Sequence, residues 1–341
     1  MAGARDVDLA THKSNKIRFR MVPGPTAGQI PYLCSSPLTL LSMKISGFSY
    51  IRNGFTYQYP FLESIQSILP ICDEFVVAVG NSTDGTREAI KALHDPKIRI
   101  VDTVWNEHMR TGGTIFAQQA NIALDACTGD WLFHIQADEI IHENDLPTIR
   151  TAIEKADADE RVEGMLFDFL NFYGSYNYLN GSRYQHKKEI RIIRAGLDAR
   201  SYRDSQGFRK YPPQLAQKPG FKGEKLRVRA IGVPVYHYSY VRPPKEMSQK
   251  SRYFSSFYLN DAQLEKHFAG HQEEANYYSI ERVLPFTSTH PAVMTDWIAT
   301  GNYDFDPSRI SGEMTLKKRL AYLADKLAGR RIGEYKNYKL L

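Results

Sequence analysis

The alternation of strand and helix patterns between residues 43 and 155 constrains the fold of this chain most strongly. Short apolar runs bounded by turn residues indicate buried strands, and apolar residues at helical spacing indicate helices that pack on them. In chain order the expected elements are strand Lys44–Ile51, helix Tyr59–Ile68, strand Glu74–Val79, helix Thr86–Leu93, strand Ile98–Thr103, helix Thr114–Ala126, strand Trp131–Ile135 and helix Leu146–Lys155. This alternation predicts right-handed βαβ units, and therefore an α/β fold with a doubly wound, mostly parallel sheet flanked by helices.

After Arg161 the regular alternation of strand and helix patterns stops, and this change sets the expected domain boundaries. The further expected elements are strands Gly164–Tyr173, Ile190–Arg194 and Lys225–Ile231 and helical segments Pro244–Ala269 and Leu316–Leu327. Residues 1–42 are polar and then rich in Pro and Gly, so we expect a loose tail ahead of Met43. The sequence thus predicts a tail at 1–42, an α/β domain at 43–243, and a helical C-terminal extension at 244–341 that packs on that domain.

Composition excludes several classes of protein. The hydrophobic fraction of 42% and the charged fraction of 24% are those of a soluble globular protein. The formal net charge of +6 is dispersed and no nucleic-acid-binding motif occurs, so no nucleic-acid partner is expected. No apolar run approaches the ~18 residues of a membrane span, and no signal peptide is recognisable. Cys34, Cys72 and Cys127 are far apart, which is typical of a reducing compartment, and we expect a cytoplasmic protein.

The basic segment Leu316–Arg331 carries apolar residues at helical spacing. Such a helix could lie on the anionic inner face of a membrane, as a peripheral contact. The alternative is that its leucines pack on the chain's own domain, and this packing is what we expect. The leucines concerned are Leu316, Leu320, Leu323 and Leu327.

Common nucleotide and hydrolase signatures are absent from the sequence. It contains no G-x-x-x-x-G-K-[ST], no G-x-G-x-x-G, no G-x-S-x-G and no H-E-x-x-H. P-loop nucleotide binding, the dinucleotide fingerprint, the serine nucleophile elbow and zincin chemistry are therefore not expected.

A polar turn at Gly80–Gly85 joins an expected strand to an expected helix. Free backbone N–H groups at such a helix start suit an anion or the polar groups of a nucleotide. Asp84 either contacts a base or ribose hydroxyl or only caps the helix. Gln118 and Asn121 share one face of a later helix, where they either meet the same ligand or are solvated.

The stretch Gly129–His142, GDWLFHIQADEIIH, runs from a turn through a buried strand to two acids. Ligands of open α/β sheets bind at the carboxyl ends of strands, where Asp138 and Glu139 are expected. Carboxylate oxygens are ligands that hard divalent cations prefer. The alternative is a strand end with two solvated acids.

These two stretches, in this order, resemble family 2 glycosyltransferases, which have the GT-A fold. Val77–Thr86 is similar to the family pattern V-V-D-x-G-S-T-D-G-T, and Gly129–Glu139 to G-D-W-[IL]-x-x-L-D-A-D-E. The nearest resemblance is to a bacterial group with Q-A-D-E, and it extends from Met43 to the C-terminus. Two departures are Val79 and Gln136, where the family often has acids, and the second predicts either weaker metal binding or a reaction that does not need metal.

The resemblance implies transfer of a sugar, with inversion, from a nucleotide-diphosphate sugar to a glycan or lipid-linked acceptor in polysaccharide assembly. It implies Mg²⁺ or Mn²⁺ bound by Asp138 and His237, although His237 could also be a core histidine. The side chains expected to contact the donor are Asn53, Asn81, Asp84, Gln118, Asn121, Gln136, Asp138 and Arg242. Arg242 and Lys250 could neutralise phosphate, but for Lys250 we expect an ordinary surface cation.

Inversion needs a carboxylate that takes the proton of the acceptor hydroxyl. Glu189 and Asp168 are the candidates, with Asp204 as a rival, and the alternative role of Glu189 is a salt bridge to a neighbouring cation. A nucleotidyltransferase would need a Gly-rich basic loop near the first strand, and Ser46–Asn53 does not provide one. A non-catalytic protein that binds nucleotide sugars or glycans on the same fold stays open. The sequence does not define the sugar, the base, the acceptor or the oligomeric state.

Overall fold

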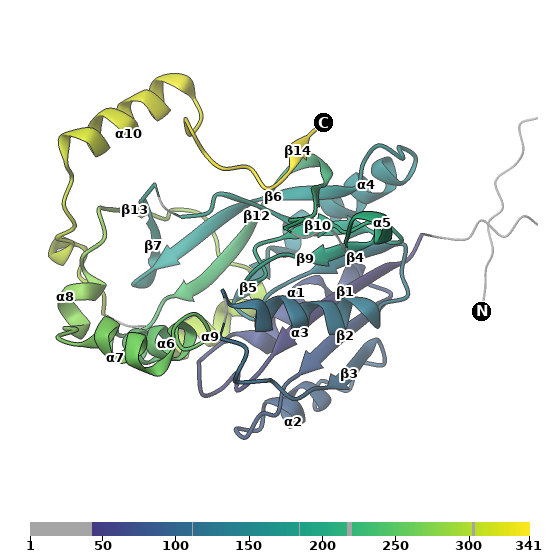
Figure 1. The fold of residues 1–341 in the computed structure, drawn as a ribbon, viewed down its shortest axis with the longest axis horizontal. Helices are drawn as coiled ribbons and strands as arrows, with labels where there is room; N and C mark the ends of the chain where they lie inside the picture. The colour runs from purple at the N-terminus through teal and green to yellow at the C-terminus, as the bar shows by residue number, and fades with distance from the viewer. Residues whose placement is uncertain (1–42, 111, 184, 217–219, 302–303) are drawn as a thin grey trace, which may run out of the picture. The chain divides into compact units, whose positions relative to one another are not determined.

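The first half of the central sheet consists of parallel strands, as the alternating sequence pattern predicts. In this computed structural model, which describes residues 43–341 except 111, 184, 217–219 and 302–303, the strands lie side by side in the order β3, β2, β1, β4 (Figure 1). Their bounds are β1 Ile45–Ile51, β2 Glu74–Val79, β3 Ile98–Asp102 and β4 Trp131–His134. The predicted N-terminal tail at 1–42 lies outside the described residues.

The expected helices connect these strands. They are α1 (Phe61–Ile68), α2 (Thr86–Lys91), α3 (Thr114–Asp125) and α4 (Leu146–Asp157), and each has ends within two residues of those predicted. The residues of β2 are buried on both faces of the sheet. Its odd-numbered residues belong to one apolar cluster, whereas Val76 and Ala78 belong to another. Burial on both faces is what a continuous apolar strand such as EFVVAV indicates.

Beyond β4 the sheet becomes antiparallel and completes a mixed α/β arrangement of the GT-A type, which confirms the expected fold class. The strands of this half are β8 Lys188–Arg194, β6 Gly164–Tyr173, β7 Ser175–Asn180 and β13 Val283–Pro285. The sequence did not predict β7, whose polar and tyrosine-rich residues are also typical of loops, or β13, which has only three residues and ends in Pro285.

The strand β12 (Arg227–Tyr240) is twice as long as the predicted Lys225–Ile231. Gly232, with a φ of +69°, and Pro234 look like strand breakers, but they lie at a register shift in the pairing of β12 with β6. Past this irregularity β12 also pairs antiparallel with β5 (Glu139–Ile141), which places His237 opposite Glu139. The bulge therefore lets one strand join the chain after β4 to the second half of the sheet.

The remaining elements surround this sheet. They are strands β9 Ala199–Ser201, β10 Phe208–Lys210, β11 Glu224–Lys225 and β14 Lys339–Leu340, helices α5 Pro213–Ala216, α6 Pro244–Ser255, α7 Asp261–Phe268, α8 Glu273–Tyr277, α9 Thr295–Thr300 and α10 Leu316–Ala328, and 3₁₀ turns Leu69–Ile71, Glu143–Asp145, Ala292–Met294 and Pro307–Arg309. The expected helical segment Pro244–Ala269 is two helices, because Asn260 starts the second with a capping box.

The leucines of α10 do not pack on the domain as expected. Each of the four is more than half exposed, and the helix stands away from the central sheet (Figure 1). The contacts that hold α10 come instead from its polar face, through Tyr322 and Asp325. Amphipathic spacing predicted the helix correctly, but the spacing alone could not tell which face would turn toward the protein.

We predict that Phe133→Ala lowers the free energy of unfolding by about 3–5 kcal/mol, because Phe133 is fully buried in β4 and the cavity left behind collapses only partly. Phe55→Ala is the matched control, since Phe55 is 45% exposed, and it should lower that free energy by less than about 1 kcal/mol. Urea unfolding followed by circular dichroism checks both values. Equal losses for the two variants would contradict the position of β4 in the core.

Candidate active site

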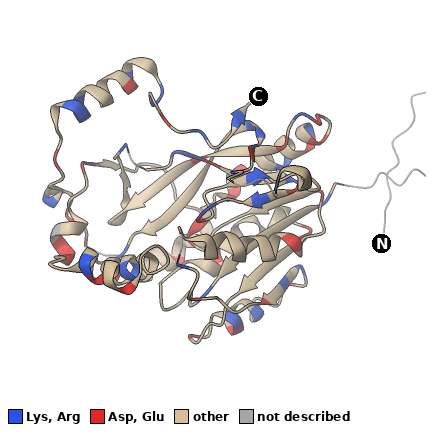
Figure 2. Cartoon of the chain, viewed as in Figure 1, with Lys and Arg blue, Asp and Glu red and all other residues tan. Residues whose placement is uncertain are grey.

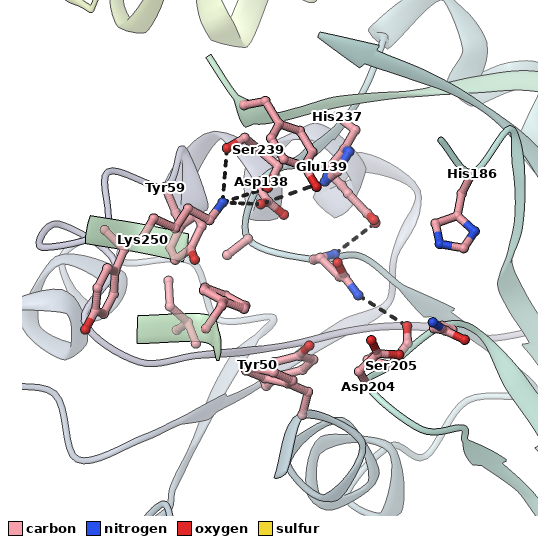
Figure 3. A pocket seen from close by; sticks show the side chains of 18 of the residues that line it. Tyr50, Tyr59, Asp138, Glu139, His186, Asp204, Ser205, His237, Ser239 and Lys250 are labelled. Atoms are coloured by element: carbon pink, nitrogen blue, oxygen red, sulfur yellow. Dashed lines mark hydrogen bonds and ion pairs between the residues drawn. The ribbon is translucent and has the colours of Figure 1, made fainter. Parts of the chain in front are cut away.

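A cavity of about 460 Å³ opens where the carboxyl ends of β1 and β4 meet β5, β8 and β12. Helix α6 and the end of β12 complete its wall, and Figure 3 shows side chains from these elements converging on it. This is the edge of an α/β sheet at which ligands bind. The chain segment 136–139, between β4 and β5, contributes all four of its residues to the lining.

Asp138 lies in this segment and is fixed by its neighbours. Its backbone carbonyl accepts a hydrogen bond of 2.9 Å from the N–H of Tyr238 in β12. Its Oδ2 lies 3.3 Å from Lys250 Nζ and 3.9 Å from His237 Nε2 (Figure 3). Burial raises the pKa of Asp138, but the charge of Lys250 opposes it, and the net pKa is low. Asp138 is therefore an ionised carboxylate in a nearly closed position.

Lys250 is not the surface cation expected from the sequence. It projects from α6 into the cavity wall, is 5% exposed, and donates to Ser239 Oγ at 2.6 Å as well as to Asp138. Its Nζ also lies 4.6 Å from the centre of the Tyr59 ring, a cation–π distance. Burial, and then the charge of Arg242, lower the pKa of Lys250 to about 7, and Asp138 opposes that shift. The helical pattern of α6 predicted a helix but not that this face would cover the cavity.

His237 reaches the same carboxylate from β12. Its Nδ1 lies 2.8 Å from Asn171 Oδ1, and the Asn171 amide nitrogen donates to the carbonyl of His186. Because that second bond orients the amide, the Oδ1 must accept from His237 Nδ1–H. The pKa of His237 is lowered by burial, so the neutral ring turns its unprotonated Nε2 toward Asp138.

The second acid of the segment has a structural role. Glu139 is 1% exposed and receives two hydrogen bonds from Arg191, at 2.8 Å from Nε and 2.6 Å from Nη2. Arg191 is itself buried, and this bidentate geometry is the strong form of a carboxylate pair. Glu139 is therefore neutralised by β8 and not available to a ligand.

The residues around Asp138 do not provide the ligand set that a divalent cation prefers, which is several oxygen atoms with negative charge. Gln136 brings an uncharged amide, Glu139 is bound by a guanidinium, and the ammonium of Lys250 occupies the Oδ2 that His237 also faces. Across the described ranges, no three His, Cys, Asp or Glu side chains converge as a metal group. Asp138 and His237 lie close together, as the resemblance implies. The ammonium group of Lys250, however, occupies the position beside Asp138 at which a divalent cation would bind.

Glu189 lines the opposite wall of the cavity. Its side chain is only 12% exposed, and Oε1 lies 3.3 Å from His186 Nδ1. Burial raises the pKa of Glu189 to about 8, with Arg191 opposing and nearby carboxylates adding to the shift. A carboxyl with a pKa near neutrality is typical of groups that exchange protons with a substrate.

The other two candidate bases have other surroundings. Asp168 is paired with Lys188 and does not line the cavity. Asp204 does line it, and accepts a hydrogen bond of 2.6 Å from the Tyr258 hydroxyl. Of the two predicted catalytic carboxylates, the structure therefore brings only Glu189 to the cavity that holds Asp138.

Six of the eight predicted donor contacts lie outside the cavity wall, and Arg242 is one of them. Asn53, Asn81 and Asp84 accept hydrogen bonds from backbone N–H groups of the neighbouring loops, at 3.0, 3.3 and 2.8 Å. Asn121 accepts one of 2.8 Å from β9, and Gln118 is exposed. The hydrogen bonds of Asp84 lower its pKa although burial opposes them, and its side chain also bonds the N–H at the start of α2. The N-cap of α2 is Gly85, without a side-chain cap, so Asp84 makes local hydrogen bonds beside the helix start but is not its N-cap.

Gln136 and Arg242, two of the predicted contacts, differ from each other. Gln136 lines the cavity and donates to the Ser205 carbonyl at 3.3 Å. Arg242 is buried, but its guanidinium donates to the Tyr57 carbonyl at 2.7 Å instead of lining the cavity. Its position after a histidine suggested phosphate binding, whereas its observed role is to tie down a loop.

Several residues that line the cavity were not predicted from the sequence. They include the aromatic side chains Tyr50, Tyr59 and Trp105 and the cation Arg52. Tyr50 and Arg52 lie at the carboxyl end of β1, and the rule that ligands bind at strand ends could have found them. Tyr59 and Trp105 lie in loops, where no spacing marks them.

The family of the chain follows from comparison with known sequences. The sequence model of glycosyl transferase family 2 matches residues 57–240, which is more than half of the chain. No curated protein matches the sequence.

Distant similarity to solved structures accompanies this match. Glucosyl-3-phosphoglycerate synthase from Mycobacterium tuberculosis, in complex with Mn²⁺, UDP and glucosyl-3-phosphoglycerate, is 21% identical over 39% of this chain and 46% of that chain, with a TM-score of 0.27. Residues 1–349 of S. aureus TarS are 16% identical over 69% of this chain and 72% of that chain, with a TM-score of 0.34. The chain spans less than half the length of the mycobacterial synthase.

The segment matched by the family runs from the loop after β1 to the end of β12, and so contains Asp138, Glu189 and His237. It therefore covers most of the strands that build the cavity. This chain belongs to glycosyl transferase family 2.

Proposed function

We propose that the chain transfers a sugar from a nucleotide-diphosphate sugar to an acceptor hydroxyl, with inversion at the anomeric carbon. The observation that carries the proposal is a single cavity holding both a buried cation, Lys250, fixed by Asp138, and a carboxyl with a raised pKa, Glu189. We infer a glycan or lipid-linked acceptor in polysaccharide assembly on the cytoplasmic side. We also infer membership of the bacterial group whose motif is Q-A-D-E, here Gln136–Glu139.

The donor side of the reaction is assigned to Lys250. The bond between the anomeric carbon and the diphosphate oxygen breaks, and its electron pair leaves with the diphosphate. A fixed positive charge stabilises this developing negative charge, most effectively where water is excluded. Lys250 has that position, and Tyr50 lines the same cavity with an aromatic side chain against which a sugar or base can pack.

The resemblance implies Mg²⁺ or Mn²⁺, but the proposed reaction does not use a metal. Because the residues around Asp138 fit a lysine better than a divalent cation, no step is assigned to a metal. Lys250 supplies one positive charge to the same carboxylate that would otherwise hold the cation.

The acceptor side of the reaction is assigned to Glu189. As the acceptor oxygen forms its bond to the anomeric carbon, its proton passes to the Glu189 carboxylate. The pKa of about 8 means that the basic form of Glu189 becomes more abundant as the pH rises through that value. Activity should therefore rise with pH as Glu189 loses its proton and fall as Lys250, whose pKa is lowered to about 7, loses its charge, which gives a bell-shaped pH profile.

We predict that Glu189→Gln lowers kcat by about 10²–10⁴-fold, because the acceptor proton loses its receiving group. The variant should bind the donor as well as the parent does, and its residual activity should no longer rise with pH. Steady-state kinetics with a panel of UDP-, GDP- and dTDP-sugars, after a screen for thermal stabilisation, measure this.

Asp168→Asn is the control, since Asp168 lies outside the cavity, and it should leave kcat within a few-fold of the parent. A Glu189→Gln variant with full activity would refute the assignment of the base. Donor binding without turnover in the parent, under every metal condition, would instead favour the non-catalytic binding protein.

We predict that Lys250→Met lowers kcat/KM by about 10²–10³-fold, the effect of removing one fixed donor from a developing negative charge. The parent should keep its activity in EDTA. Lys245→Met, on the exposed side of the same helix, is the control and should leave kcat/KM unchanged.

A second variant guards against misfolding, since a lone buried Asp138 destabilises the fold. Lys250→Met combined with Asp138→Asn removes both charges, and should fold while staying inactive. A parent that is inactive in EDTA and restored by Mn²⁺, with Lys250→Met unaffected, would contradict the assignment to Lys250.

A further inference from the structure

Helix α10 carries a continuous stripe of exposed leucines. Leu316, Leu320, Leu323 and Leu327 follow the spacing i, i+4, i+7 and i+11, which places them on one side of the helix. Their exposed fractions are 73%, 57%, 52% and 79%. Four neighbouring leucines exposed to this extent form an apolar surface of the kind that marks an interaction site.

The opposite side of α10 fixes the helix with this stripe turned outward. Asp325 pairs with Arg183 at 2.9 Å, and Lys318 pairs with Glu281 at 2.8 Å. The hydroxyl of Tyr322 accepts a hydrogen bond of 3.0 Å from the backbone N–H of Arg183. Positions 318, 322 and 325 share the side opposite the leucines. An amphipathic helix that packs on a core turns its apolar face toward the protein. In α10 the polar face is turned toward the protein instead, and its hydrogen bonds and ion pairs hold the leucines outward.

Basic residues border the leucine stripe on both sides. By helical spacing, Lys317 lies along one edge, and Arg319 and Lys326 lie along the other. Figure 2 shows Lys and Arg at several points along this helix. Residues 316–341 contain eight Lys and Arg against two acids, an excess equal to the net charge of +6 of the whole chain.

We propose that the leucine stripe of α10 inserts into the headgroup region of an anionic membrane, with the helix lying parallel to the surface. The stripe supplies the apolar contact and its two basic borders meet anionic headgroups, which is the arrangement of interfacial helices. A second copy of the chain fits less well, because pairing two such helices would bring their basic borders together. No helix in the described part of the chain is long and apolar enough to cross the bilayer.

A second cavity connects this helix to the proposed catalytic base. It measures about 520 Å³ and is lined by Lys317 and Lys318 of α10, by Lys187, and by Glu189 and His186, which also line the first cavity. An acceptor held at the membrane surface therefore reaches Glu189 along a wall richer in cations than in carboxylates. If the proposed function holds, on which this step rests, the acceptor is a lipid-linked molecule with an anionic group next to its reactive hydroxyl.

Sedimentation of the full chain with vesicles tests the membrane contact. We expect binding to phosphatidylcholine vesicles that contain phosphatidylglycerol, weaker binding at high salt, and little binding to phosphatidylcholine alone. Leu320→Ser combined with Leu323→Ser should lower the affinity at least about tenfold, since each removes apolar surface from the membrane. The unfolding midpoint should not change, because both side chains are exposed.

Two controls separate the outcomes. Leu284→Ser, an exposed leucine on β13, should bind vesicles like the parent. Lys317→Gln with Arg319→Gln and Lys326→Gln should lose the preference for anionic lipid.

Vesicle binding that is unchanged in the double leucine variant would overturn the proposal, as would a dimer in light scattering that this variant dissociates. Donor hydrolysis without vesicles should be the same in the double leucine variant and in Leu284→Ser, so failure of the membrane proposal is distinct from failure of the catalytic one.

Discussion

The antiparallel pairing of β5 with β12 is the constraint on which the candidate site depends. It places Glu139 beside His237 and turns the segment after β4 back across the sheet. Asp138, just ahead of β5, is held at its backbone by β12 and at its side chain by α6. Residues separated by about a hundred positions in the sequence meet at one carboxylate, and the bulge near Pro234 makes this possible.

Buried charges around this pairing are compensated in pairs. Glu139 is matched by Arg191 and Asp138 by Lys250, each within hydrogen-bond distance and with little exposure to water. Such pairs add little net stability, but removing one partner leaves an uncompensated charge that is strongly destabilising. Glu189 is the exception, because burial and neighbouring carboxylates outweigh Arg191 and raise its pKa. The cavity wall thus combines two matched pairs of charges with one carboxyl, Glu189, whose pKa is raised.

Sequence patterns predicted the sheet, its helices and the strand end at Asp138, because these depend on local periodicity. They did not predict the position of Lys250, since helical spacing cannot show which face of α6 covers a cavity. They placed Asn53, Asn81 and Asp84 at the donor, whereas these side chains bond to nearby backbone. Short polar side chains near turns serve either purpose, and only the surrounding loops decide between them. The predicted β12 was too short, because Gly232 and Pro234 are residue types that usually end a strand. Only the pairing of β12 with β6 shows that they lie at a register shift within one strand.

The two cavities share the wall formed by His186 and Glu189. A molecule in the first cavity and a molecule in the second therefore meet the same carboxyl from two sides. Two substrates that enter by separate cavities do not compete for one path, so each can arrive or leave while the other stays bound.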